Sequence, residues 1–119
     1  MRVLLVDDEE ELVSALAERM SFRGIDAEWA TSGQKALEMA AEGCHEVAVL
    51  DVKMPGMGGL ELKRRLMERC PAIKVIFLTG HGSEEDFMKG SAEAGREFYL
   101  VKPVAIDELI GKMREVLRR

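Results

Sequence analysis

The chain has 119 residues, of which 47% are hydrophobic and 33% charged, which favours one globular domain. Its formal net charge of -5 and its pI of about 5.1 argue against direct nucleic-acid binding. Only a short apolar run separates Arg2 from Asp7, too short for a signal peptide or a membrane span. We therefore expect a cytoplasmic domain with no membrane contact.

Strand and helix patterns alternate along the whole chain, beginning with the apolar strand at residues 2–6. A run of acids follows at residues 7–11, and residues 12–20 then carry apolar side chains at helical spacing. Those acids suit the first turn of this helix, where one side chain would cap it. Further strands are predicted at residues 25–30, 46–51, 73–78 and 98–101, and further helices at residues 34–42, 59–69, 84–94 and 105–117.

The alternation predicts a doubly wound α/β fold, with parallel strands covered by helices on both faces. A strand–helix unit occurs five times in residues 1–119, and no linker or low-complexity tract interrupts the series. We therefore expect one domain over residues 1–119. It would be either a stand-alone protein or a part of a longer one.

Four of the five predicted strands end on polar residues: Asp7 with Asp8, Asp51, Thr79 and Lys102. Because parallel strands end at one edge of a sheet, and ligands gather at that edge, these side chains are expected to converge. Each has an ordinary explanation alone, as a strand end, a turn former or a solvated charge. The joint placement favours a site.

The chemistry that suits these groups is phosphoryl transfer. Three crowded carboxylates repel one another unless a cation lies between them, and carboxylate oxygens favour Mg²⁺. Asp51 can attack phosphorus as a nucleophile and form an aspartyl phosphate. Lys102 would stabilise the negative charge of the transferred group, and Thr79 would donate a hydrogen bond to it.

The only two cysteines, Cys44 and Cys70, lack CxxC spacing. We expect reduced thiols, as in most cytoplasmic proteins, although the sequence leaves a disulfide open. The adjacent Cys44 and His45 are poor candidates for a pair of metal ligands, because neighbouring residues in a strand point to opposite faces of the sheet.

With these residues identified, the chain resembles a receiver domain of bacterial two-component response regulators, similar to the chemotaxis type. The segments that carry the resemblance are VLLVDDE at 3–9, VLDVKMPGMGGLEL at 49–62, IFLTG at 76–80 and FYLVKP at 98–103. The resemblance implies a flavodoxin-like sheet of order 2-1-3-4-5, an order that general accounts of this fold already give for a receiver. It also implies a phosphoprotein of a phosphorelay signal transduction system.

The family's site residues carry over position by position. Asp51 would accept a phosphoryl group from a phosphohistidine. Mg²⁺ would bind Asp8, the side chain of Asp51 and the backbone carbonyl of Lys53, with Asp7 supporting it through water. Lys102 would contact the phosphoryl group, and the domain would catalyse only its own phosphorylation and dephosphorylation rather than act as an enzyme on other substrates.

The resemblance also implies a switch, in which Thr79 moves toward the phosphoryl group and Tyr99 changes rotamer with it. Lys53 and His81, each two residues beyond a site residue, would modulate the hydrolysis rate. The Lys102–Pro103 peptide bond would be cis, as it usually is in the family.

The implied partner is a sensor histidine kinase or a histidine phosphotransfer protein. An output domain or a second copy of the chain would dock on the face built from residues 84–94, 98–101 and 105–117.

Two other functions also fit a parallel sheet. A Mg²⁺-dependent phosphohydrolase of the haloacid dehalogenase type uses an Asp nucleophile, but it has a second acid where this chain has Lys53. A flavodoxin-like electron carrier binds a flavin phosphate after its first strand, where this chain has the acidic residues 7–11. Both are disfavoured.

Overall fold

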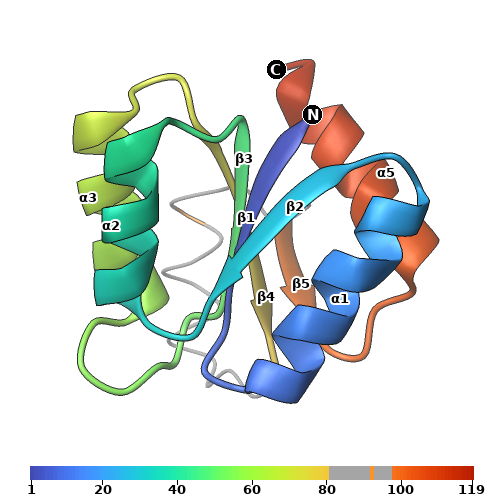
Figure 1. The fold of residues 1–119 in the computed structure, drawn as a ribbon, viewed down its shortest axis with the longest axis horizontal. Helices are drawn as coiled ribbons and strands as arrows, with labels where there is room; N and C mark the ends of the chain where they lie inside the picture. The colour runs from blue at the N-terminus through green and yellow to red at the C-terminus, as the bar shows by residue number, and fades with distance from the viewer. Residues whose placement is uncertain (81–91, 93–97) are drawn as a thin grey trace.

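The computed structural model describes residues 1–80, 92 and 98–119 (Figure 1). The strands are β1 (Arg2–Val6), β2 (Asp26–Ala30), β3 (Val47–Leu50), β4 (Lys74–Thr79) and β5 (Tyr99–Val101). The helices are α1 (Glu10–Phe22), α2 (Gly33–Glu42), α3 (Gly59–Arg69) and α5 (Ile106–Leu117). Each matches a predicted element to within one or two residues at most ends. The helix predicted at residues 84–94 lies outside the described residues.

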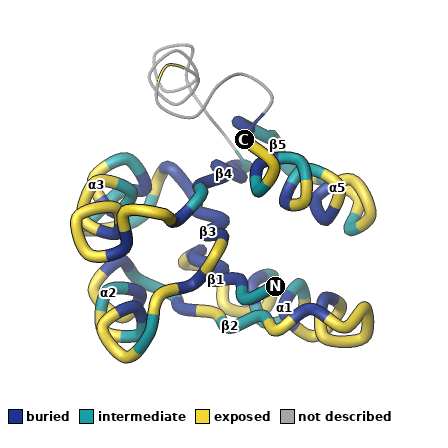
Figure 2. Tube along the Cα trace, turned by 90° about the horizontal axis from the view of Figure 1, so that it is seen from above, coloured by how far each residue is buried: buried dark blue, intermediate teal, exposed yellow. Residues whose placement is uncertain are grey.

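The strands form one parallel sheet in the order β2-β1-β3-β4-β5. Helices α2 and α3 cover one face of the sheet, and α1 and α5 cover the other (Figure 1, and from above in Figure 2). This confirms the predicted doubly wound α/β fold and its strand order.

The core is divided between the two faces of the sheet, because successive strand residues point in opposite directions. Along β1, Val3 and Leu5 pack on the side of α1 and α5, whereas Leu4 and Val6 pack on the side of α2 and α3. All four are almost fully buried, and β1 is drawn mostly in dark blue in Figure 2. Helix residues complete the two layers: Val13, Met20, Leu109 and Met113 on one side, and Ala36, Ala40, Leu62 and Leu66 on the other.

The helix starts differ in how they are capped. At α2 the hydroxyl of Ser32 accepts a hydrogen bond from the backbone N–H of Lys35 at 3.1 Å, which is the usual role of an N-cap serine. At α1 the N-cap residue is Glu9, but its side chain makes no capping hydrogen bond, so the predicted acidic side-chain cap is wrong. The Asp7 carboxylate instead accepts a hydrogen bond from the Glu9 N–H at 2.9 Å, which fixes the turn before the helix.

Cys44 and Cys70 form a disulfide, with Cα atoms 5.8 Å apart, so the expectation of two reduced thiols is wrong. The spacing along the chain hides this proximity, because the bond joins the turn after α2 to the end of α3. The Lys102–Pro103 peptide bond is cis, as the family resemblance implied. Within the described part of the chain, no helix is long and apolar enough to cross a membrane.

Gly59 begins α3 where the backbone folds back against the end of β3. Its N–H donates to the Val52 carbonyl at 2.9 Å, and a Cβ built on Gly59 would lie 2.3 Å from the Asp51 carbonyl oxygen. That distance is far inside van der Waals contact, and the obstructing atom belongs to rigid backbone. The close approach of α3 to the residue that follows β3 therefore requires glycine at position 59.

A pair of glycine substitutions tests this packing. Gly59→Ala should lower the free energy of unfolding by about 2 kcal/mol or more, because the added methyl group forces the backbone apart. Gly111→Ala is the matched control, since Gly111 is exposed in α5 and a Cβ there meets open space. It should raise stability by about 0.5–1 kcal/mol. Urea denaturation measures both, and equal effects would contradict the proposed close approach.

Candidate functional site

The carboxyl ends of β1, β3 and β4 are aligned by the register of the sheet. Val6 pairs with Leu50, and Leu50 pairs with Phe77. The ladder extends one residue further, because the Asp51 N–H donates to the Val6 carbonyl at 2.9 Å. Asp7 and Asp51 therefore leave neighbouring strands at the same level, as the sequence predicted.

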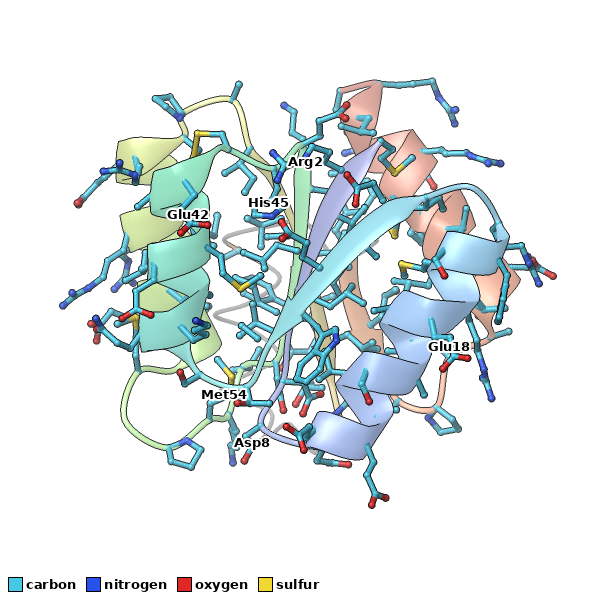
Figure 3. All side chains as sticks on the ribbon, in the orientation of Figure 1. Arg2, Asp8, Glu18, Glu42, His45 and Met54 are labelled. Carbon is cyan, nitrogen blue, oxygen red and sulfur yellow. A yellow bond between two sulfur atoms is a disulfide. The ribbon has the colours of Figure 1, made fainter. Side chains whose placement is uncertain are left out.

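Three carboxylates meet at this edge. Asp7, Asp8 and Asp51 each offer an oxygen, and these oxygens all lie within 4.8 Å of one another. Asp7 and Asp51 are both 6% exposed, whereas Asp8 is exposed to solvent. Figure 3 shows Asp8 at the lower end of the sheet, in the same region as Met54 of the loop after β3. A set of hard oxygen donors with one side open to water suits a divalent cation that keeps some of its waters.

Lys102 brings a positive charge to the same edge from the end of β5. Its Nζ lies 2.5 Å from Asp7 Oδ2, 3.8 Å from Asp51 Oδ2 and 3.7 Å from Glu9 Oε1. The Lys102 N–H donates to the Thr79 carbonyl at 2.9 Å, which holds the residue beside the end of β4. The ammonium is largely buried and therefore partly offsets the repulsion between the two buried carboxylates.

The balance of these interactions appears in the pKa values. Burial, followed by the negative charge of Asp7, raises the pKa of Asp51. The Lys102 ammonium and hydrogen bonds from the Thr79 hydroxyl and the Lys53 N–H oppose this rise without cancelling it. Burial tends to lower the pKa of Lys102, but the hydrogen bond to Asp7 and the surrounding carboxylates raise it above its usual range. Lys102 is therefore charged at neutral pH.

A cavity of about 250 Å³ opens at this edge and can receive a small anion beside Asp51. Its lining consists of Asp8, Glu9, Asp51, Lys53, Thr79, Gly80 and Lys102. The structure thus brings together all the residues that the sequence assigned to the site among the described residues, except Tyr99. Asp7 lies behind the lining and contacts it through Lys102.

Besides Asp7, one predicted site residue within the described part of the chain does not line the cavity. Tyr99 is buried in the adjacent strand, with its ring centroid 6.0 Å from that of Phe77. His81 lies outside the described residues. Glu9 also lines the cavity, although the sequence pattern assigns it only to a helix start; its position directly after two strand-end acids is the signal that could have found it.

A match to a known protein family accounts for this cluster of acidic residues and Lys102 at the edge of the sheet. Residues 3–114 match the model of the response regulator receiver domain. The chain belongs to this family. The receiver domain is a phospho-acceptor module of two-component signal transduction, and an acidic cluster at the carboxyl edge of a five-stranded sheet is in keeping with that role.

Curated response regulators are similar to this chain in sequence over its whole length. The chain is 39% identical over 119 residues to response regulator MprA of Mycobacterium avium, and equally so to MprA of Mycobacterium leprae. These matches cover 100% of this chain and 52% of each relative, so the chain spans about half the length of the curated relatives it matches.

Solved structures agree. A receiver domain protein from Clostridium thermocellum superposes with a TM-score of 0.87 at 28% identity, covering 99% of this chain and 94% of that one. A CheY-like receiver from Methanospirillum hungatei superposes with a TM-score of 0.87 at 31% identity, covering 98% of this chain and 93% of that one. Neither the phosphohydrolase nor the electron-carrier alternative is favoured by these matches.

The raised pKa of Asp51 predicts the sign of a stability change. A carboxyl group that binds its proton more tightly in the folded receiver loses stability as the pH rises through the interval from its unfolded pKa to its folded pKa. At neutral pH its charge is therefore a net cost. Asp51→Asn should melt higher than the parent at pH 7 in EDTA.

The difference should shrink as the pH falls toward about 4, the unfolded pKa of an aspartate, because the carboxyl group is then protonated in both states. Asp26→Asn is the control, since Asp26 is an exposed aspartate at the opposite end of the sheet. Thermal melts between pH 4 and pH 8 make the measurement. A lower melting temperature for Asp51→Asn at pH 7 would show that Lys102 and the hydrogen bonds to Asp51 outweigh the effects of burial and of Asp7.

Proposed function

We propose that Asp51 is the phospho-acceptor of this receiver. The observation that carries the proposal is the position of its carboxylate, which borders an open cavity with Asp8 and Lys102 and accepts a hydrogen bond from the Lys53 N–H at 3.2 Å. A carboxylate oxygen of Asp51 attacks phosphorus while the bond from phosphorus to the imidazole nitrogen of a phosphohistidine breaks. The product is an aspartyl phosphate.

The neighbouring groups have separable roles in this proposal. Lys102 moves little to contact an oxygen of the phosphoryl group, since its Nζ already lies 3.8 Å from Asp51. The Thr79 hydroxyl, which donates to Asp51 in this structure, would donate to the phosphoryl group instead. Lys53 borders the cavity and would modulate the rate at which water reaches phosphorus, together with His81.

Mg²⁺ is the proposed cofactor, held by Asp8, Asp51 and the backbone carbonyl of Lys53, with Asp7 in support. Three carboxylate oxygens within 4.8 Å of one another fit a hard divalent cation, and burial together with the charge of Asp7 raises the pKa of Asp51, which a nearby cation would oppose. When bound, the ion would neutralise charge on the phosphoryl oxygens.

The proposed partner is a sensor histidine kinase or a histidine phosphotransfer protein in the cytoplasm. The domain would modify only itself and would not act as an enzyme on other substrates. Its output would be transmitted through Thr79 and Tyr99, because Thr79 ends β4 and Tyr99 lies in the paired strand β5. An output domain or a second copy would bind the face that includes β5 and α5, where Val101 is 56% exposed.

Phosphorylation can be tested directly. Incubation with acetyl phosphate and Mg²⁺ should add one phosphoryl group to the parent, as seen by intact mass, and add none to Asp51→Asn. Asp26→Asn tests whether removing any aspartate has this effect, and it should be phosphorylated like the parent. Phosphorylation of Asp51→Asn at the parental level would refute the assignment, and so would its absence from the parent.

Metal binding can be tested by thermal stability. A ligand that binds only the folded state stabilises it by about 2.7 kcal/mol at a hundredfold excess over its Kd. Mg²⁺ should therefore raise the melting temperature of the parent, whereas Asp8→Asn should lose this response. Glu11→Gln, which removes an exposed acid from the first turn of α1, should keep it. A parent that ignores Mg²⁺ would contradict the metal site.

A further inference from the structure

The disulfide lies at the opposite end of the sheet from the phosphorylation site. Cys44 is in the turn between α2 and β3, and Cys70 ends α3. Figure 3 shows His45, next to Cys44 in the chain, and Arg2 at the upper end of the sheet, with Asp8 at the lower end. The two cysteines are 26 positions apart in the sequence, and the bridge closes the loop of chain between them, which contains β3, Asp51 and α3.

Hydrogen bonds to their backbone atoms position both cysteines in addition to the bridge. The Arg2 guanidinium donates to the Cys44 carbonyl at 3.0 Å. The Cys70 N–H donates to the Leu66 carbonyl at 2.7 Å, and the Cys70 carbonyl accepts from the Ile73 N–H at 3.0 Å. If the sulfur–sulfur bond opens, the two thiols therefore stay close enough to form it again.

The two sulfur-bearing residues differ in access to solvent. Cys44 is exposed, whereas Cys70 is 3% exposed. Both line a cavity of about 430 Å³ at this end of the sheet, together with residues that include Pro71, Lys74 and Leu117. A small thiol can enter this cavity and approach Cys44, while the buried side of the bridge is shielded.

We propose that the Cys44–Cys70 bridge is a reversible thiol–disulfide exchange site whose reductant is a dithiol. One thiolate of the dithiol forms a bond to Cys44 Sγ, and the bond between Cys44 and Cys70 breaks, leaving its electron pair on Cys70 Sγ, which takes a proton. The second thiol of the reductant then attacks the reductant's first sulfur, which is bonded to Cys44 Sγ in the mixed disulfide. The bond to Cys44 breaks, and Cys44 is released as a thiol. The protein gains two thiols, and the reductant leaves as a cyclic disulfide.

Such a site has a use in a reducing compartment. Disulfides are uncommon in cytosolic proteins, and those that occur there are usually transient or redox-sensing. Opening the bridge frees the unfolded chain from a cross-link around β3 and α3, so the folded state becomes less stable. The carboxyl edge should keep its geometry, because the hydrogen bonds from β3 to β1 and β4 are independent of the bridge.

The first test follows the bridge in the intact protein. The folded chain is treated with dithiothreitol without denaturant, alkylated with iodoacetamide and weighed by intact mass. Two alkyl groups should appear only after reduction, and the reduced protein should melt about 10 °C lower than the oxidised one. Oxidised dithiothreitol should restore both properties. Reduction that requires denaturant, or equal melting temperatures, would overturn the proposal.

The second test uses matched serine variants to establish which sulfur is attacked. Cys70→Ser leaves the exposed Cys44 and should form a mixed disulfide with oxidised glutathione in the folded state. Cys44→Ser leaves the buried Cys70, which should react at least tenfold more slowly. The Cys44→Ser/Cys70→Ser double variant should melt like the reduced parent and ignore dithiothreitol. Equal reactivity of the two single variants would refute attack at Cys44.

Discussion

The structure of the site depends on two negative charges that the sheet forces together. The register of β1 and β3 leaves Asp7 and Asp51 no freedom to separate, because each directly follows paired strand residues. Lys102 lies 2.5 Å from one carboxylate and 3.8 Å from the other, so it compensates them unequally. Burial, followed by the charge of Asp7, raises the pKa of Asp51, and Lys102 only partly opposes this rise. A cation bound between the carboxylates would reduce the repulsion at this edge.

The two ends of the sheet are built on different principles. At the carboxyl end, like charges are crowded and a cavity is kept open. At the other end, charges are matched: Arg2 donates to Glu28 at 3.1 Å, and Glu28 also contacts the buried His45 at 2.7 Å. The hydrogen bond with His45, followed by the charges of His45 and Arg2, lowers the pKa of Glu28 against the effect of burial. These contacts join β1 and β2 to the residues that precede β3.

The sequence was sufficient for features set by local pattern. Strands such as β1 are apolar runs between polar residues, and helices such as α5 repeat apolar side chains every three or four residues, so periodicity finds them. The convergence of Asp51 with Lys102 also followed, because parallel strands share an edge. Pairs such as Cys44 with Cys70 and His45 with Glu28 could not be found this way, since residues that meet only through tertiary packing leave no mark on local spacing. The prediction of a cis peptide bond before Pro103 came from the family resemblance and not from periodicity.

The position of Gly59 shows how tightly the phosphorylation site is connected to the rest of the fold. The Asp51 carbonyl lies so close to Gly59 that α3 cannot shift toward β3, and the same helix ends at Cys70 in the bridge. The segment from β3 through α3 is therefore fixed at both ends, by backbone contact near the site and by a covalent bond far from it. On the other side of Asp51, β5 is a short edge strand with Val101 exposed, and Lys102 follows directly. Because β3 and α3 are held at both ends, we expect a change in charge at Asp51 to be transmitted through Thr79 and β5, in keeping with the output route proposed above.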